Sequence, residues 1–380
     1  MPDYTPLYGD LVQFKEAISF FKQKSLLPTQ SYNDLQGLIH SKAFTVAGAT
    51  KVQLLKDLYE TVNHGIENGE TIAEFRLRFD KTVTTHGWSY NGKRGWRTQA
   101  IFQNNKNTAR AAGRWQQQLR TAKTRPFLLY ITAGDERVRD LHNKWHYILL
   151  PIDHPFWISH YPPNGWGCRC KVMSVNERDI KRMGLKLTNP DPLKKYLTPI
   201  ENIDTKTGEF ITKLPGIDIG WDYNPGKAWL GSDVGMGKSI LELSSDLRDV
   251  AIPNFNRGII KSAPHFEKQI INVAAKVASG KSIDASNIFM IGHLPNPIIN
   301  ASFAKGAGLF NSAVVIDEAV ILSALKSGIS FDSMTQLMNY VHNVTQFSIS
   351  TRQVKITYKD LLLTIEYADT INRVILIESI

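Results

Sequence analysis

Apolar residues recur at helical spacing through the first third of the chain. Three such segments, Phe14–Lys24, Lys51–Asn68 and Thr71–Val83, are typical of amphipathic helices. The third opens with a Thr-x-x-Glu sequence, the spacing of a capping box. A longer helix is predicted over Thr98–Ala122, where small residues indicate close packing and basic residues follow one side. The pattern therefore predicts a helical lead-in over residues 1–125.

Short apolar runs replace the helical pattern further on. Phe127–Ala133 predicts a buried strand, and the K-V-M-S-V sequence after Cys170 predicts another. Near the C-terminus apolar residues alternate in Val354–Tyr358 and Leu361–Tyr367, and Arg373–Glu378 completes an antiparallel meander. Helices followed by an antiparallel sheet are typical of the α+β class. We therefore predict an α+β protein: a helical N-terminal region leading into a mixed α/β core, then a separate C-terminal α+β module with an antiparallel sheet.

Charge and tryptophan content change together along the 380 residues. Phe266–Ile380 carries nine basic and nine acidic residues, so the formal net charge of +10 lies on Met1–His265, as do all eight tryptophans. This predicts a boundary near residue 265. A basic excess suits a nucleic acid or an acidic protein partner, and a solvated basic surface explains it equally. The predicted domains are 1–226 (lead-in 1–125, focal core 126–178), a linker over 227–265, and a module over 266–380.

The compartment is predicted from what the sequence lacks. No run of 18 apolar residues occurs, so we expect no membrane span. The first ten residues have neither a basic nor an apolar signal region, so we expect no secretion signal. The two cysteines are spaced C-x-C, too close for ordinary disulfide geometry. Free thiols favour a reducing cytoplasm.

Reactive side chains concentrate between Asp135 and Cys170. These 36 positions hold four histidines, both cysteines, three tryptophans and three arginines. His142 and His146 are four residues apart, so on a helix both would project from one face. Cys168 and Cys170 would lie on one side of an extended segment. Two His and two Cys could form a closed tetrahedral site, which predicts a structural zinc ion as the cofactor.

Two other interpretations of these residues remain open. The cysteines could be reduced thiols packed under Trp166, with His142 hydrogen-bonded to Asp135 or Asp153. Either cysteine could instead be a nucleophile, with Arg169 lowering its pKa and His142 acting as the base. The glycines and prolines before the cysteines favour a fixed turn over a nucleophile.

Three arginines of the stretch could bind an acidic group in bidentate fashion. Arg137, Arg139 and Arg169 are equally well explained by pairing with Asp135 or Asp140. We therefore interpret Asp135, Arg137, Arg139 and Arg169 first as a structural network.

At these residues a family resemblance appears. The order G-D-E-R-V-R-D-L-H, H-P-F-W and Y-P-P-N-G-W-G-C-R-C resembles the phage Mu F-like head morphogenesis family of minor head proteins. Upstream the sequences F-K-E-A-I-S-F-F-K-Q-K, A-F-T-V-A-G, G-W-R and N-K-N-T-A-R-A-A-G-R-W also match. Downstream P-G-I-D-I-G-W-D-Y-N-P-G matches, so the resemblance covers residues 10–226 or so.

The resemblance implies a protein packaged in small copy number with the portal and procapsid. It implies head assembly as the role, with portal and capsid or scaffold proteins as partners, no membrane contact, and passage with the DNA as a further option. The implied location is the bacterial host cytoplasm during assembly and then the virion head.

The C-terminal module is similar in outline to phage-borne nuclease modules of the barnase, EndoU, colicin and RelE-like group. This implies an alternative function, a phage-delivered effector with an RNase-type toxin and an immunity protein as partner. The candidate catalytic residues, which would serve in acid–base chemistry, are His342, Arg352 and Lys359. The module's net charge of zero is unfavourable for binding RNA, whose phosphates are negatively charged.

Overall fold

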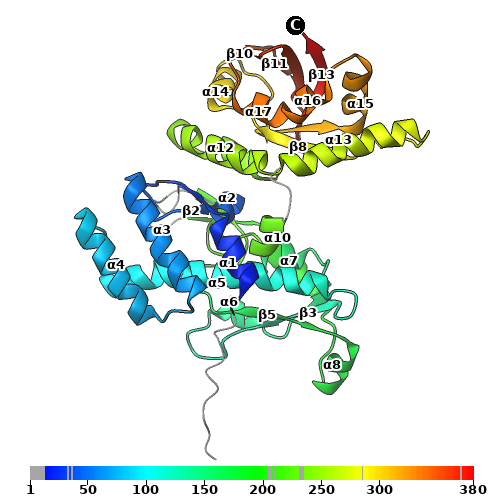
Figure 1. The fold of residues 1–380 in the computed structure, drawn as a ribbon. Helices are drawn as coiled ribbons and strands as arrows, with labels where there is room; N and C mark the ends of the chain where they lie inside the picture. Colours follow the sequence, from blue (N-terminus) through cyan, green and yellow to red (C-terminus); the bar gives the residue numbers. More distant parts are fainter. Residues whose placement is uncertain are drawn as a thin grey trace, which may run out of the picture. The chain divides into compact units, whose positions relative to one another are not determined.

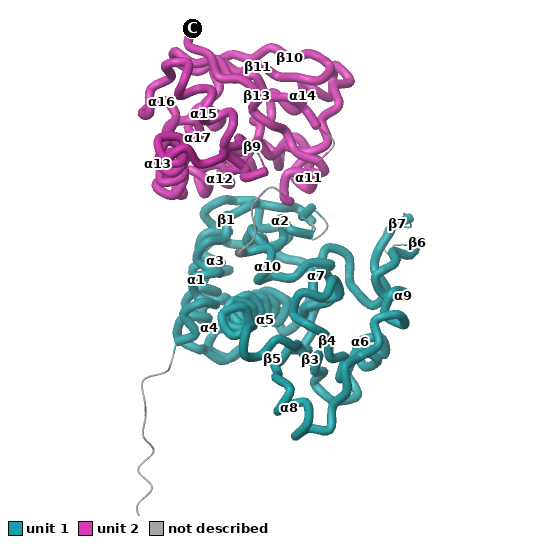
Figure 2. Tube along the Cα trace, turned by 90° about the vertical axis from the view of Figure 1, so that its right-hand side faces the viewer, with its two compact units in different colours: residues 1–231 teal, residues 232–380 magenta. Residues whose placement is uncertain are grey.

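A computed structural model describes residues 13–31, 34–35, 37–203, 208, 210–230, 235–284, 286–368 and 370–380. The chain forms two compact units, unit 1 over Met1–Gly231 and unit 2 over Ser232–Ile380 (Figure 2). Each unit has its own elements and its own core.

The first part of unit 1 is helical, as predicted (Figure 1). Its main helices are α1 (Lys15–Lys22), α3 (Val52–Glu67), α4 (Ile72–His86) and α5 (Arg94–Arg120). The capping box at the start of α4 is confirmed: the Thr71 backbone N–H donates to Glu74 Oε2 at 2.7 Å, and the Glu74 N–H donates to Thr71 Oγ1 at 3.4 Å. Because α5 contacts α1, α3 and α4, it joins these helices around one core. Six fully buried rings fill that core: Phe20, Phe21, Phe44, Phe75, Phe79 and Phe102.

Residues 225–230 return to this helical part as the short helix α10 (Pro225–Leu230). The helical part itself also contains three short elements: β1 (Ser25–Leu26), α2 (Gly37–Lys42) and β2 (Ala43–Phe44). The helix α10 packs on α5 and α2. A Cβ at Gly226 would overlap the Trp115 side chain, so this close approach requires glycine. The Asn224 side chain accepts hydrogen bonds from the N–H groups of Gly226 and Lys227 at 3.0 Å and so caps the returning helix.

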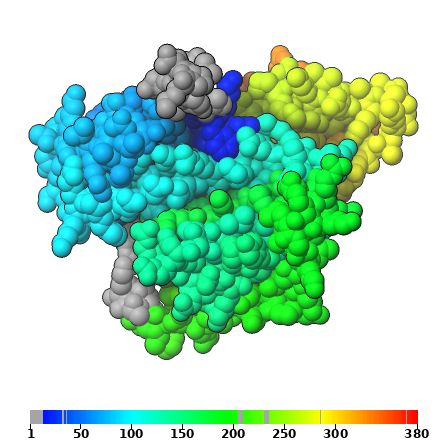
Figure 3. Space-filling view, turned by 90° about the horizontal axis from the view of Figure 1, so that it is seen from below, coloured from blue at the N-terminus to red at the C-terminus, as the bar shows by residue number. Residues whose placement is uncertain are grey.

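The second part of unit 1 is a small antiparallel sheet covered by short helices and loops. Its strands follow the order β4 (Leu149–Pro151), β3 (Phe127–Ile131), β5 (Lys171–Val175), with Leu128 opposite Leu150 and Ser174. The helices are α6 (Asp140–Lys144), α7 (Phe156–Ser159), α8 (Glu177–Arg182), η1 (Asp191–Leu193) and α9 (Lys194–Leu197). Six fully buried aromatic rings form the centre: Tyr130, Trp145, Phe156, Trp157, Tyr161 and Trp221. In Figure 3 the cyan helical part and the green second part of unit 1 adjoin along one face.

Unit 2 contains one six-stranded sheet in the order β10-β11-β12-β13-β9-β8. Its strands are β8 (Ile288–His293), β9 (Ala313–Asp317), β10 (Gln346–Ile349), β11 (Gln353–Tyr358), β12 (Leu361–Glu366) and β13 (Asn372–Ser379). Its helices are α11 (Met236–Leu241), α12 (Ser245–Ile260), α13 (Ala263–Ala278), α14 (Asn296–Ala304), α15 (Glu318–Lys326), α16 (Phe331–Thr335) and α17 (Leu337–His342). The predicted meander is present as β11, β12 and β13, and the α+β class is confirmed. The parallel pairing of β13 with β9 was not predicted.

The predicted linker over 227–265 is wrong. Residues 225–230 form α10 of unit 1, and α11 and α12 belong to unit 2, which begins at Ser232. Although Pro253 and Gly258 interrupt the sequence pattern, α12 buries Ala251, Ile252 and Phe255. Charge could not reveal the boundary, because residues 232–265 carry four basic and four acidic residues. Moving the boundary across them leaves the net charge of both sides unchanged.

Two smaller features complete the described chain. Between residues 190 and 226, unit 1 contains α9 and a hairpin of β6 (Ile200–Ile203) and β7 (Phe210–Lys213). In unit 2, the helical segment from Phe331 to His342 is divided at Gln336 into α16 and α17. None of the helices in the described part of the chain combines the length and apolar content needed to cross a bilayer.

Candidate functional site

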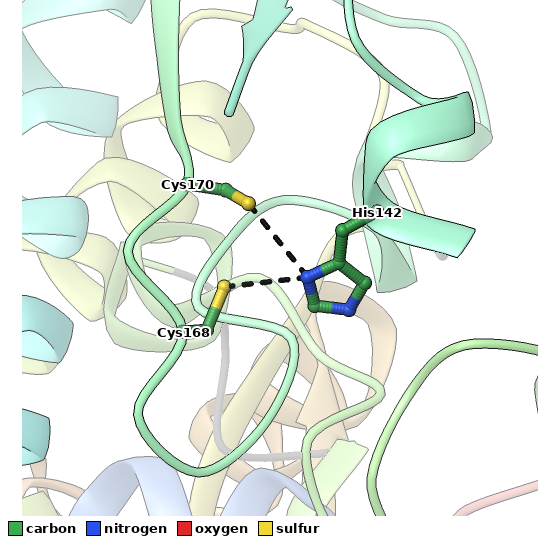
Figure 4. A group of neighbouring side chains, drawn as sticks. All are labelled: His142, Cys168 and Cys170. Atoms are coloured by element: carbon green, nitrogen blue, oxygen red, sulfur yellow. Dashed lines mark hydrogen bonds between the residues drawn. The ribbon is translucent and has the colours of Figure 1, made fainter. Parts of the chain in front are cut away.

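His142, Cys168 and Cys170 form a compact cluster in unit 1 (Figure 4). His142 comes from α6, and the two cysteines come from the loop that precedes β5. The distance from His142 Nδ1 is 3.8 Å to the Cys168 Sγ and 3.7 Å to the Cys170 Sγ. All three ligand-type atoms lie within 4.8 Å of one another. Of the four residues predicted as zinc ligands, the fold brings these three together.

The orientation of His142 is set by its other ring nitrogen. Nε2 lies 2.9 Å from the backbone oxygen of Gly216, and the ring stacks on Trp145 at 4.8 Å between centroids. Because a carbonyl oxygen only accepts, Nε2 carries the hydrogen, and in the neutral ring Nδ1 presents its lone pair to the sulfurs. Gly216 has a φ of +78°, and a Cβ there would lie 2.7 Å from the Trp145 ring. The partner carbonyl therefore depends on a glycine.

Two asparagines of α5 hold the cysteine loop. The Gly167 N–H donates to Asn104 Oδ1 at 2.9 Å, and Asn107 Nδ2 donates to the Cys168 backbone oxygen at 3.1 Å. Within the loop, the Cys168 N–H donates to the Gly165 oxygen at 3.1 Å. Sequence reasoning missed both asparagines. Their i, i+3 spacing in N-N-K-N, which places both side chains on one face of a helix, is the signal that could have identified them.

Asp135 is the centre of an ion-pair group at the edge of the cluster. Arg169 donates to both of its carboxylate oxygens, at 2.5 and 2.6 Å. The Arg137 backbone N–H donates to the same carboxylate at 3.1 Å, and its guanidinium does so at 3.3 Å. The bidentate Arg169 contact holds the pKa of Asp135 well below its usual range. Arg137 and Arg169 thus both pair with Asp135.

Arg139 joins a different carboxylate. Its guanidinium donates to Asp218 Oδ2 at 3.0 Å and to the Trp166 backbone oxygen at 2.9 Å. Asp218 also accepts from the Trp166 N–H at 2.9 Å, and a Cβ at Gly165 would overlap both partners of the pair. Neither Asp135 nor Asp140 is the hydrogen-bond partner of this guanidinium. Sequence reasoning missed Asp218, which lies 79 positions away.

His146 points away from the two cysteines. Its Nδ1 accepts from the Thr132 backbone N–H at 3.1 Å and lies 3.2 Å from the Thr132 hydroxyl. The prediction placed His142 and His146 on one face of a helix, but α6 ends at Lys144. The chain turns after that point, and the shared face does not exist. The expected four-residue ligand set is therefore reduced to three among the residues that the structure describes.

The other two histidines of the stretch have local roles. His154 Nδ1 accepts from the Phe156 N–H at 3.1 Å. His160 is buried against Phe156 and Trp145 and lies 2.9 Å from the Ser159 hydroxyl. Burial lowers the pKa of His160 to about 3, so it stays neutral.

The two thiols influence each other. The neighbouring Cys170 lowers the pKa of Cys168 well below its ordinary value, and His142 adds to that effect. Proximity to Cys168 raises the pKa of Cys170. Cys168 is 6% exposed, and Arg169 is engaged with Asp135. This burial is unfavourable for the nucleophile interpretation, because an attacking thiolate must be reachable.

Two cavities adjoin the cysteine loop. A small one of about 90 Å³ lies beside the cluster and is lined by ten residues that include all three arginines of the stretch. A larger one of about 460 Å³ is lined by residues of the helical part, the β6–β7 hairpin and three tryptophans, Trp96, Trp166 and Trp221. Trp166 lines both cavities.

The candidate catalytic residues of unit 2 do not share one place. Arg352 lies in the turn between β10 and β11, and Lys359 lies in the turn between β11 and β12. A strand of six residues spans about 20 Å, so these two side chains belong to opposite ends of β11. His342 ends α17, where partial burial, with Arg257 nearby, lowers its pKa. The structure therefore separates Arg352 from Lys359.

Comparisons with known proteins address the segment that builds the cluster. Residues 56–173 match the family model described as Phage Mu protein F like protein. Over 267 residues the chain is 30% identical to "Putative capsid assembly protein F" of Escherichia phage Mu, covering 64% of this chain and 61% of that protein. It is 28% identical to "Mu-like prophage FluMu F protein" of Haemophilus influenzae, covering 65% of this chain and 64% of that protein. No solved structure matches.

The chain thus spans less than two thirds of the length of these relatives. The matched segment runs from α3 to β5 and contains α5, His142 and both cysteines. Through residues 56–173, this chain is similar to the Phage Mu protein F like family.

Proposed function

We propose that this protein is a minor head protein that acts in the assembly of a phage head. The observation that carries the proposal is the similarity over 267 residues to a protein named for capsid assembly. A head-assembly role implies the portal and the capsid or scaffold proteins as partners. It also implies the virion head as the location of the protein. The proposal concerns unit 1 first, because the matched family segment lies inside it.

Unit 1 offers a surface suited to a protein partner. The larger cavity is bordered by Trp96, which is 64% exposed, and by the β6–β7 residues Ile203 and Ile211. Exposed aromatic residues beside a cavity are frequent anchors in protein interfaces. We therefore place the contact with a head component at this cavity.

Removing the gene from the phage that encodes the chain tests the assembly role. We expect fewer intact heads in lysates, counted by electron microscopy, and a lower plaque titre. Supplying the full-length protein from a plasmid should restore both. Normal heads at normal titre without the gene, with the protein absent from purified heads, would contradict the proposal.

The Trp96→Ala variant tests the contact surface. We expect it to fold normally and to be incorporated into heads at a level at least several-fold lower than the wild type, measured by mass spectrometry of purified particles. Leu77→Ala is the matched control, because Leu77 is 71% exposed in the same unit and does not line the cavity. Equal incorporation of both variants would place the contact elsewhere.

Passage with the DNA is a second part of the proposal. It is favoured by the charge of unit 1, which carries 32 basic and 22 acidic residues. Binding of the full chain to duplex DNA should weaken steeply as salt rises, because released counterions drive such binding. Fluorescence anisotropy at two salt concentrations measures this. If the full chain did not bind DNA at low salt, passage with the DNA would be contradicted, and the proposed assembly role would be unaffected.

The RNase-type effector is not proposed as the function of unit 2. Its support from the sequence was the outline of the C-terminal module together with three candidate residues, of which Arg352 and Lys359 lie at opposite ends of β11.

A further inference from the structure

We propose that His142 Nδ1 and the two thiolates of Cys168 and Cys170 bind one transition-metal ion of the zinc class. The fourth position would be taken by a water molecule on the side of the small cavity. This site is independent of the head-assembly role and goes beyond it.

The two N–S separations fit a tetrahedral ion. Zn–S bonds of about 2.3 Å and Zn–N bonds of about 2.0 Å at a tetrahedral angle give N–S separations of about 3.5 Å. The observed separations from His142 Nδ1 are 3.8 Å to Cys168 and 3.7 Å to Cys170. The two N–S separations therefore match an ion after shifts of a few tenths of an ångström. The two sulfurs lie within 4.8 Å of each other, and a tetrahedral ion would hold them about 3.8 Å apart.

The hydrogen positions also point to an ion. The Gly216 carbonyl takes the hydrogen of His142 Nε2, which leaves one lone pair on Nδ1. Both sulfurs lie close to this one nitrogen, but its single lone pair can accept a hydrogen bond from only one S–H group. A cation satisfies all three atoms at once. Donation of the second ring N–H to a backbone carbonyl is also the usual arrangement of a metal-bound histidine.

The backbone holds the three ligands in place without the ion. Asn104 and Asn107 fix the cysteine loop on α5, and Trp145 stacks on the ring of His142. A rigid support of this kind is what keeps ligands at binding geometry. The nearby positive charge is also compensated, since Arg169 pairs with Asp135 and Arg139 pairs with Asp218. Two thiolates and a divalent ion would then form a neutral group.

The fourth position follows from the surroundings. Among the residues that the structure describes, no fourth His, Cys, Asp or Glu joins the group. The cavity beside it, about 90 Å³, is lined by His142 and both cysteines and has room for water, which needs roughly 10–15 Å³ of such space. Three protein ligands plus water is a known arrangement for zinc with a Cys₂His set.

The expected consequence is structural. The ion would link α6 to the loop before β5, which a disulfide cannot do because both cysteines lie in that loop. Because the ligands must be deprotonated, binding should release protons and should weaken as the pH falls.

The test uses full-length protein purified under reducing conditions. We expect about one zinc per chain by mass-spectrometric metal analysis, as a single site requires. Replacement by Co²⁺ should produce thiolate-to-metal charge-transfer absorption. Removal of the ion by a chelator should lower the melting temperature of unit 1, followed by the fluorescence of its tryptophans. Protein without stoichiometric zinc, without the cobalt absorption and with unchanged melting after chelation would overturn the proposal.

Single variants test the ligand set. His142→Asn, Cys168→Ser and Cys170→Ser should each lower zinc affinity by more than the ~100-fold typical of losing a supporting hydrogen bond. His146→Asn is the matched control, because this histidine bonds Thr132 and should leave affinity unchanged. Full zinc content in Cys170→Ser would overturn the assignment.

A second measurement avoids the folding of variants. Alkylation of the wild-type thiols should slow at least tenfold when Zn²⁺ is added and recover with chelator. Equal rates with and without Zn²⁺ would overturn the proposal, whatever the variants do.

Discussion

The two units of this chain are organised in contrasting ways. The centre of unit 2 is a six-stranded sheet, in which regular backbone pairing positions the core. The main sheet in the second part of unit 1 has three short strands, and its loops are held by side chains that reach far along the sequence, such as Asn104 to Gly167 and Arg139 to Asp218. Unit 1 also carries all eight tryptophans and the whole net charge, whereas unit 2 has 13 basic and 13 acidic residues.

The difference teaches where single residues should matter most. In a sheet the backbone ladder is shared by many residues, so one side chain contributes a part of the packing. In the loop-rich half of unit 1, a single buried ring or amide determines the position of a whole loop. Four substitutions test this comparison, in order of expected effect.

Trp145→Ala should have the largest effect. The ring is fully buried and contacts Tyr130, Phe156 and His160. We expect unit 1 to lose about 3–5 kcal/mol of unfolding free energy. Urea unfolding followed by near-ultraviolet circular dichroism measures the loss. Trp96→Ala, at an exposed position, is the control. An equally small loss of unfolding free energy in both variants would show that the buried ring of Trp145 does not stabilise unit 1.

Glu318→Ala should have the next largest effect, in unit 2. This buried carboxylate accepts from Lys276 Nζ at 2.6 and 2.8 Å, from Asn287 at 2.8 Å and from the Asp284 N–H at 3.1 Å. Losing these bonds should cost about 2–3 kcal/mol. Hydrogen exchange should show the loss in unit 2 with unit 1 unchanged. Glu366→Ala, at an exposed position on β12, should be nearly neutral.

Asn104→Ala should cost less, about 1 kcal/mol, because the part-buried hydrogen bond from the Gly167 N–H to Asn104 is lost. Asn105→Ala is a close control, since its amide bonds the Ile101 carbonyl of its own helix. Thermal unfolding of both variants measures the difference. Equal melting temperatures would show that the cysteine loop does not depend on this amide.

Asp135→Asn should have the smallest effect, and that effect should depend on pH. Arg169 lowers the pKa of Asp135 in the folded state, so its stabilisation is present above the unfolded pKa of about 3.9. It is lost as the pH falls from there through the lower folded pKa. The wild type should therefore melt slightly higher than the variant at pH 6, and the gap should close toward pH 2. If the difference in melting temperature grew as the pH fell, the carboxylate of Asp135 would not have the lowered pKa assigned to it.

Local features of unit 1 were predictable from the sequence. The capping box of Thr71 and Glu74 is present because its two hydrogen bonds join residues three positions apart. The helices α1 and α3 follow from apolar spacing, since one face of each packs into a shared core. The strands β11 and β12 follow from alternation, since one side of each is buried.

The candidate site was predictable in part. His142, Cys168 and Cys170 stood out by residue type and proximity in the sequence, and the fold brings them together. His146 was wrongly expected beside them, because sequence spacing cannot show that α6 ends after five residues.

The sequence by itself determined the helical lead-in, the α+β class and the residues from which a metal ligand set could be drawn. The tertiary structure decided which of them converge, and it supplied Asn104, Gly216 and Asp218 as supports. It also placed the boundary between the units at residue 232. The physical reason is the range of the interactions: capping and periodicity act over three or four residues. The contacts that build the site join groups 26 to 79 positions apart, which only the folded chain brings within hydrogen-bond distance.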